Sequence, residues 1–111
     1  MKRIKWELEE SVALMNLYFC SGAKIPVDQG ELESLSSVYV KRASMLGYDV
    51  DKKYRNVNGL NMQLACIHYV VTEGREGLSS ASKLFYDTYD LYKNNKTKFD
   101  DILEDFNKKY R

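Results

Sequence analysis

KYRNVNGLNMQLACIHYV, residues 53–70, is the stretch that decides the fold class of this chain. It opens on cations and asparagines, passes Gly59, and continues as an apolar run. Apolar side chains recur there at spacings of three and four, which is typical of the buried side of an amphipathic helix. These side chains are Leu60, Leu64 and Ile67, and Val71 continues the same spacing just after the stretch. The sequence therefore predicts a helix that begins near Val57 and ends near Val71.

The start of this helix has two candidate caps. The side chains of Asn56 and Asn58 can each accept a hydrogen bond from the free amides of a first helical turn. The sequence leaves both assignments open. The preceding segment GYDVDKKYRN, residues 47–56, is polar and is expected to be a connector.

Two helices are predicted before this connector. Residues 4–21 carry Leu8, Val12, Met15 and Phe19 at helical spacing, while the acids, including Glu10, fall mostly on other faces. Asp28 and Glu31 resemble a capping box, which predicts a second helix over residues 29–46. Its expected apolar face consists of Leu32, Leu35, Tyr39 and Leu46.

One alternative concerns the middle of this second helix. The segment SSVYV, residues 36–40, contains β-branched and aromatic residues that suit a short strand. The flanking sequence has a helical pattern, so we expect a helix there.

Two further helices are predicted after the glycine-marked loop TEGREGLSS, residues 72–80. The first is capped by a serine, ends at Asn94 and Asn95, and buries Leu84, Phe85, Tyr89 and Tyr92. Thr97 and Asp100 predict a capping box for the last helix. Its apolar face consists of Phe99, Ile102, Leu103, Phe106 and Tyr110.

The expected fold is therefore all-α: a compact bundle of about five helices in a single domain, residues 1–111. A tri-helical core resembling a helix-turn-helix is one way to arrange it. With 17 basic and 16 acidic side chains the formal net charge is only +1, so any nucleic-acid binding must come from local clusters.

The cysteines and the apolar runs of the chain bear on its compartment and on its need for a cofactor. Cys20 and Cys66 are far apart and lack metal-ligand spacing, so we expect both to be reduced and buried. No apolar run approaches the roughly 18 residues of a membrane span, and no signal core begins the chain. These features predict a cytoplasmic protein that has no membrane contact and needs no cofactor.

The catalytic inventory is small. The chain has one histidine and neither a phosphate-binding glycine loop nor a nucleophile elbow. A cluster of acids near the C-terminus could hold a divalent ion, although a solvated helix face near the positive end of the helix dipole is the preferred interpretation. These acids are Asp100, Asp101, Glu104 and Asp105. We therefore expect no enzymatic activity.

The residues around 52–68 carry the strongest case for binding. Asn58, Asn61 and His68 share one side of the predicted helix, and an asparagine amide can pair with an adenine edge. Lys52, Lys53 and Arg55 precede that side and could contact phosphate. The six residues form a candidate nucleic-acid site. The alternative interpretation is purely structural: the asparagines cap the helix, and Arg55 pairs with an acid on a neighbouring helix.

A family resemblance adds to this case. Trp6 and Glu9, the LYF that ends the first helix, the proline loop, the LSS of residues 35–37 and YRNVNGLNMQL together resemble the N-terminal head domain of bacterial HNH restriction endonucleases and related defence proteins. The later segment GREGLSSASKLFYDTYDLYKNNKTKFDDI resembles the family's glycine loop and the helices after it. The likeness spans nearly the whole chain.

This resemblance implies a helical module of proteins that act on DNA. The HNH metal-site pattern is absent from this sequence, so the resemblance does not imply nuclease activity. A non-enzymatic DNA-binding or DNA-targeting module is the first expectation. The second is a protein-interaction module that dimerises or docks a partner subunit, because the charge is near neutral and aromatic residues are favoured as interface anchors.

Overall fold

A computed structural model describes residues 4–111, which form five α-helices and no strand. The helices are α1 (Leu8–Cys20), α2 (Gln29–Met45), α3 (Val57–Val71), α4 (Lys83–Asn94) and α5 (Lys96–Tyr110). Residues 36–40 lie inside α2, which excludes the strand alternative. The expected all-α bundle is confirmed.

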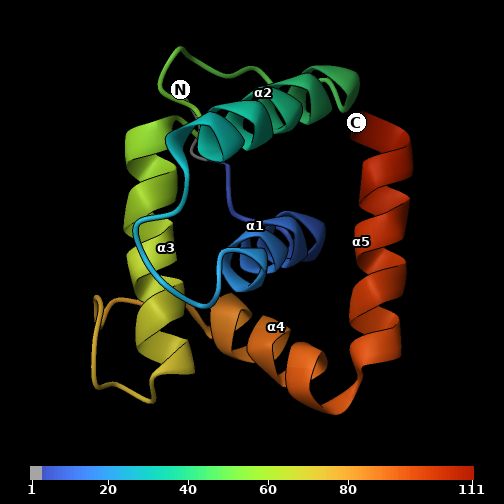
Figure 1. The fold of residues 1–111 in the computed structure, drawn as a ribbon. Coiled ribbons are helices and arrows are strands. Elements are labelled where there is room, and N and C mark those ends of the chain that lie inside the picture. Colours follow the sequence, from blue (N-terminus) through green and yellow to red (C-terminus); the bar gives the residue numbers. More distant parts are fainter. Residues whose placement is uncertain (1–3) are drawn as a thin grey trace.

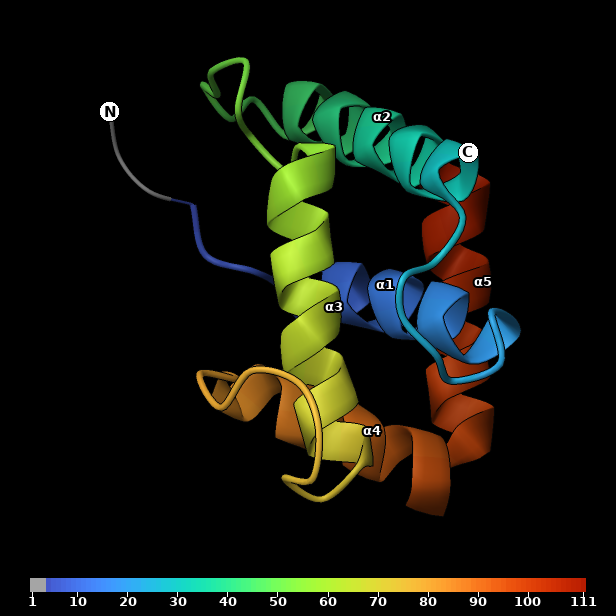
Figure 2. The same ribbon diagram turned by 60° about the vertical axis from the view of Figure 1, so that its left-hand side comes forward.

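Four of the helices form a closed frame around the fifth. Figures 1 and 2 show α2, α3, α4 and α5 as the four sides, with α1 passing through the middle. Each outer helix packs against α1 and against its two neighbours, whereas the opposite pairs α2 with α4 and α3 with α5 make no contact. The central helix α1 is therefore the common packing partner of all the others.

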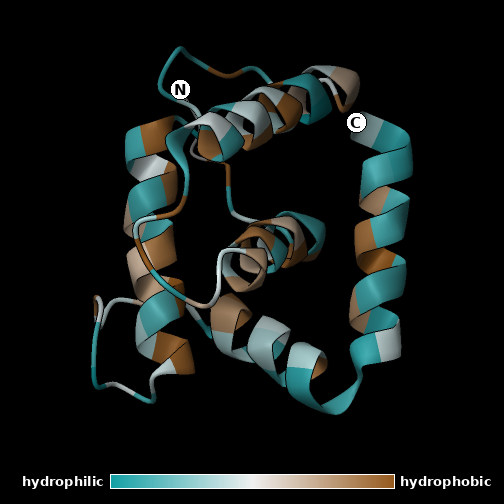
Figure 3. Cartoon of the chain, in the orientation of Figure 1, coloured by the Kyte–Doolittle hydropathy of each residue, from teal (hydrophilic) through white to brown (hydrophobic). Residues whose placement is uncertain are grey.

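The sequence of α1 suits this central position. Six consecutive residues, from Glu10 to Met15, are buried, so this helix has no solvent-facing side in its middle. Figure 3 shows apolar residues on the central helix, while α5 carries long polar stretches. Glu10 was expected on a face other than the apolar one, and the structure shows that this face is buried as well, because the other four helices all pack against α1.

The ends of α1 and α2 differ slightly from their predicted positions. Helix α1 begins at Leu8 rather than at residue 4, because the Glu7 amide donates to Glu10 Oε1 at 3.1 Å in a capping box. Asp28 caps α2 as predicted, accepting from the Glu31 amide at 3.0 Å. Leu46 lies just beyond the end of α2 and is 44% exposed, so it does not continue the buried face.

The caps of α3 and α5 are both asparagines. Asn56 Oδ1 accepts a hydrogen bond from the Gly59 amide at 2.8 Å, which identifies Asn56 and not Asn58 as the cap of α3. Asn95 caps α5 by accepting from the Lys98 amide at 3.4 Å. The predicted capping box at Thr97 is wrong because Thr97 already lies inside the helix.

The loop between α3 and α4 folds back onto α3. The Leu78 amide donates to the carbonyl of Ala65 at 3.1 Å. Gly77 makes this possible, because its φ of +96° is unfavourable for other residues and a Cβ there would collide with the backbone of Ala65 and Tyr69. The returning loop therefore covers part of the C-terminal half of α3.

The connector between α2 and α3 occupies residues 46–56. It is much longer than the three- to four-residue turn of a helix-turn-helix motif. Within residues 4–111, no helix combines the length and the apolar character needed to cross a bilayer. Cys66 is buried as expected, whereas Cys20 is exposed near the end of α1.

Candidate nucleic-acid interface

Arg55 points into the protein, toward the central helix. Its Nε lies 2.8 Å from Glu10 Oε2, and its Nη2 lies 3.1 Å from Glu10 Oε1. The guanidinium also stacks over Trp6, 4.4 Å from the ring centroid. Only 9% of the Arg55 side chain is exposed. This pairing was the structural alternative for Arg55, and it takes the residue out of the expected set of free phosphate contacts.

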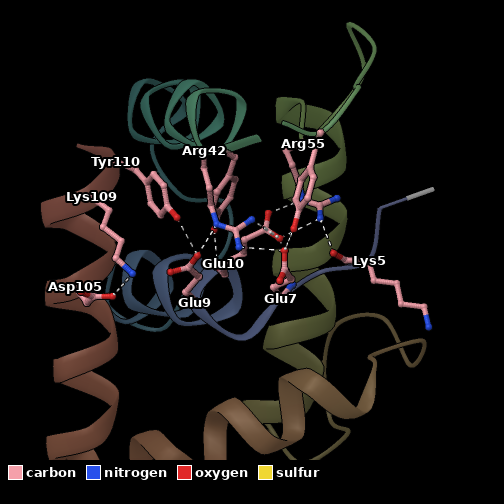
Figure 4. A network of polar contacts seen from close by, with 11 residues as sticks. Lys5, Glu7, Glu9, Glu10, Arg42, Arg55, Asp105, Lys109 and Tyr110 are labelled. Atoms are coloured by element: carbon pink, nitrogen blue, oxygen red, sulfur yellow. Dashed lines mark hydrogen bonds and ion pairs between the residues drawn. The ribbon is translucent and has the colours of Figure 1, made fainter. Parts of the chain in front are cut away.

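Arg42 completes the same ionic cluster from the side of α2, as Figure 4 shows. Its Nε lies 2.6 Å from Glu9 Oε1, and its Nη2 lies 3.0 Å from Glu7 Oε1. Burial disfavours the charged guanidinium, but the hydrogen bonds that Arg42 donates to Glu9 and Glu7 outweigh that effect and raise the pKa of Arg42. The N-terminal end of α1 is thus held to α2 and to the start of α3 by two arginines.

His68 is also occupied inside the protein. Its Nδ1 lies 2.7 Å from the Tyr18 hydroxyl, and its Nε2 lies 2.8 Å from Glu76 Oε1. The residue is 8% exposed. Helical spacing does place His68 near the side of α3 that carries Asn58 and Asn61, but the loop after α3 folds over this end of the helix. His68 therefore does not face a groove.

The remaining four predicted residues are exposed. Lys52 and Lys53 lie in the connector, and Asn58 and Asn61 lie in the N-terminal half of α3. Asn61 borders a shallow hollow that it shares with Ile25 and Pro26. The surface beside Asn61 is thus partly apolar.

A second surface lies on the other flank of α3. It is a groove of about 600 Å³ between the N-terminal segment, α3 and the start of α4. Its lining residues are Ile4, Lys5, Trp6, Arg55, Gln63, Ser80, Ser82, Lys83 and Leu84. We call this the basic groove, because three of these residues are cations and none is an acid. At about 100° per residue, Gln63 lies on the opposite flank of α3 from Asn61.

No local pattern in the sequence predicts the basic groove. Lys5 and Lys83 are far apart in the sequence. They line the same groove because the segment before α1 and the start of α4 both border α3. Lys83 forms an exposed pair with Asp87 at 2.7 Å, which is a weak interaction in water. Lys83 therefore remains available to an anion.

The acids of α5 lie on a solvated face. Asp100, Glu104 and Asp105 each pair with a lysine one turn away on the same helix. Across residues 4–111, no three side chains of His, Cys, Asp or Glu gather as a set of metal ligands. The acids therefore have the arrangement of stabilising surface pairs.

Comparisons with known proteins add no relative. No protein-family model, curated protein or solved structure matches this chain. The resemblance to the head domain of HNH restriction endonucleases therefore stays a prediction from the sequence.

Proposed function

We propose that this chain is a non-enzymatic module that binds DNA through the basic groove. The observation that carries the proposal is the charge of this groove: the lysines Lys5 and Lys83 border it and no acid lines it, in a protein whose formal net charge is only +1. A local basic surface of this kind attracts phosphate. The resemblance to restriction and defence proteins is the reason for choosing DNA among polyanions, and a cytoplasmic location goes with that choice.

The proposal assigns phosphate contacts to exposed lysines. Lys5 and Lys83 border the groove, and Lys52 and Lys53 are exposed in the connector that precedes α3. Arg55 contributes charge from the floor, where Glu10 neutralises most of it. Such contacts position a strand without reading its sequence.

Two sets of amides compete for the base edges. Gln63 lines the groove, whereas Asn58 and Asn61 lie on the other flank of α3. Amide side chains can offer a paired donor and acceptor to adenine. Only one flank can face a given strand, so replacing Gln63 with Ala and replacing both asparagines with Ala should affect binding differently.

The first experiment is fluorescence anisotropy of labelled duplex and single-stranded DNA at low and at physiological salt. We expect binding that weakens steeply as salt rises, because counterions are released from phosphates. Trp6 is the only tryptophan and lines the groove, so its fluorescence should change over the same titration. Absence of binding at low salt would refute the proposal.

Variants locate the contact surface. The Lys5→Ala/Lys83→Ala variant should weaken binding and lower the salt dependence, with a change in slope of about one per lost phosphate contact. The control is Lys108→Ala/Lys109→Ala, which makes the same change in charge on α5, away from the groove. Equal losses in both variants would mean that only net charge matters. Lys52→Ala/Lys53→Ala then tests whether the connector belongs to the surface.

A protein-interaction module is the second candidate, favoured by one observation. Met62 is 60% exposed and Ile25 is 37% exposed, and Ile25 borders the hollow beside Asn61. Sedimentation equilibrium over a wide concentration range tests self-association. A dimer that Met62→Asp abolishes and that salt does not weaken would favour this candidate, whereas a strict monomer would count against it.

A further inference from the structure

A groove that contains three tyrosines lies on the opposite end of α3 from the connector. It has a volume of about 430 Å³ and is bordered by the C-terminal end of α3, the turn after it and α4. We call it the tyrosine groove. Its lining includes Tyr69, Tyr86 and Tyr89 together with the carboxylates of Glu73 and Asp90. None of these residues belongs to the basic groove or to the ionic cluster at α1.

The carboxylates give this groove a negative character. Neither Glu73 nor Asp90 forms an ion pair with a cation in the part of the chain that the structure describes, although Asp90 accepts a hydrogen bond from Asn94 at 2.7 Å. Glu73 directly follows the C-terminus of α3, where the helix dipole is negative. Both effects favour a cation.

The tyrosine rings offer aromatic faces to such a cation, and a lysine of the protein already occupies one of them. Lys93 lines the groove, and its Nζ lies 4.4 Å from the centroid of the Tyr89 ring. An ammonium at that distance from an aromatic face is attracted by the ring quadrupole. Tyr86 lies on α4 one turn before Tyr89 and is 47% exposed. Among the described residues, no cation lies over its ring.

We propose that the tyrosine groove binds an alkylammonium group. Tyr86 and Tyr89 would supply aromatic faces, and Glu73 and Asp90 would supply the compensating charge. In the free protein the ammonium of Lys93 covers a face of the Tyr89 ring, so Lys93 competes with the ligand for that face. The ammonium can come from a lysine side chain of a partner protein or from a quaternary ammonium compound. This inference is independent of the proposed DNA contact, because the two grooves share no residue.

The test is an NMR titration of the ¹⁵N-labelled full chain with three probes. Tetramethylammonium represents a quaternary ligand, N-acetyl-lysine methylamide represents a lysine side chain, and tert-butanol is a neutral molecule of similar shape to the first. We expect amide shifts confined to the lining residues with one or both cations and none with tert-butanol. The cation that binds more tightly identifies the source. Equal shifts with tert-butanol, or no localised shifts with either cation, would overturn the proposal.

Variants test the individual roles. Lys93→Met should tighten binding, because it removes both the competing ammonium and a like charge while keeping most of the unbranched side chain. Tyr86→Leu should weaken it by about threefold, as expected for one cation–π contact at an exposed site. Tyr86 is half exposed, so this change should leave the fold intact. Asp87→Asn, on the same helix but outside the groove, is the control. Unchanged binding in both Lys93→Met and Tyr86→Leu would refute the proposal.

Discussion

Arg55 and Glu10 form an ion pair across the interface between the connector and α1, with Nε and Oε2 2.8 Å apart and Glu10 fully buried. A buried carboxylate is costly unless cations and hydrogen bonds compensate it. Arg55 supplies two hydrogen bonds, and Nη1 of Arg42 lies 3.6 Å away. The position of the connector, and with it the start of α3, is therefore coupled to the central helix.

Replacing Arg55 with methionine should destabilise the protein strongly. Glu10 would keep the hydrogen bond from the Glu7 amide and the more distant Arg42. Removing the closer cation of a buried ion pair costs about 3–5 kcal/mol. Urea denaturation measures the loss. Lys53→Met is the matched control, because Lys53 is exposed in the same connector. A loss below about 1 kcal/mol for Arg55→Met would show that Glu10 does not depend on this pair.

The stability of the protein should depend on the ionisation of Glu7. Burial alone would raise its pKa, but hydrogen bonds from Arg42 and Tyr48 outweigh burial, so the pKa of Glu7 lies below its ordinary value of 4.5. Between the lowered pKa of the folded state and pH 4.5, the unfolded chain binds more protons at Glu7 than the folded protein does. The stabilisation from ionised Glu7 is therefore present above pH 4.5 and is lost as the pH falls through the folded-state pKa.

Glu7→Gln tests this dependence. The variant should show a smaller loss of stability on acidification than the parent protein, measured by denaturation at a series of pH values. Glu33→Gln removes an exposed acid of α2 and serves as the control. If the stability of Glu7→Gln and of the parent protein fell equally on acidification, the lowered pKa of Glu7 would be contradicted.

The apolar positions of α3 should contribute mainly to folding. Leu60 and Leu64 are 0% and 1% exposed, so changing either to Ala should cost about 2–5 kcal/mol through lost burial and the remaining cavity. Met62, on the same helix, is 60% exposed and is the control. Thermal or urea denaturation should show only a small effect for Met62→Ala. Similar losses at all three positions would contradict the observed orientation of α3.

The two asparagines before and in α3 should differ in their effect on stability. Asn56→Ala removes the cap hydrogen bond to the Gly59 amide and should cost about 0.5–2 kcal/mol. Asn58→Ala should change stability little, because Asn58 is exposed within the first turn. The comparison separates capping from binding: a loss of DNA affinity in Asn58→Ala without a loss of stability would indicate a contact. Equal destabilisation would contradict the assignment of the cap.

Much of the local structure was predictable from the sequence. Asp28 before a first turn, the apolar spacing of Leu60, Leu64 and Ile67, and the asparagines at 94 and 95 mark helices through short-range effects. Capping and helical periodicity involve neighbours within about one turn, so a single sequence contains them. The helical interpretation of residues 36–40 also followed from its flanks.

The candidate site was less predictable, because it depends on segments that are distant in the sequence. Lys5 and Lys83 line one groove only because α3 lies between the N-terminal segment and α4. Likewise, the helical spacing of His68 suggested an exposed side, but the loop anchored at Gly77 covers it. A periodic pattern identifies the faces of a helix but not what packs against them.

The sequence by itself determined five helices, most of their ends and the apolar stripe of α3, because these depend on local propensity and spacing. Only the tertiary structure decided that α1 is the central helix and that Glu10 is therefore buried. Enclosure on all sides removes water from the Glu10 carboxylate, and the cost of that desolvation requires Arg42 and Arg55 to turn inward. Arg55 therefore pairs with Glu10 of α1 instead of facing solvent as a phosphate contact. This pairing results from packing between segments distant in the sequence, so a local sequence pattern does not predict it.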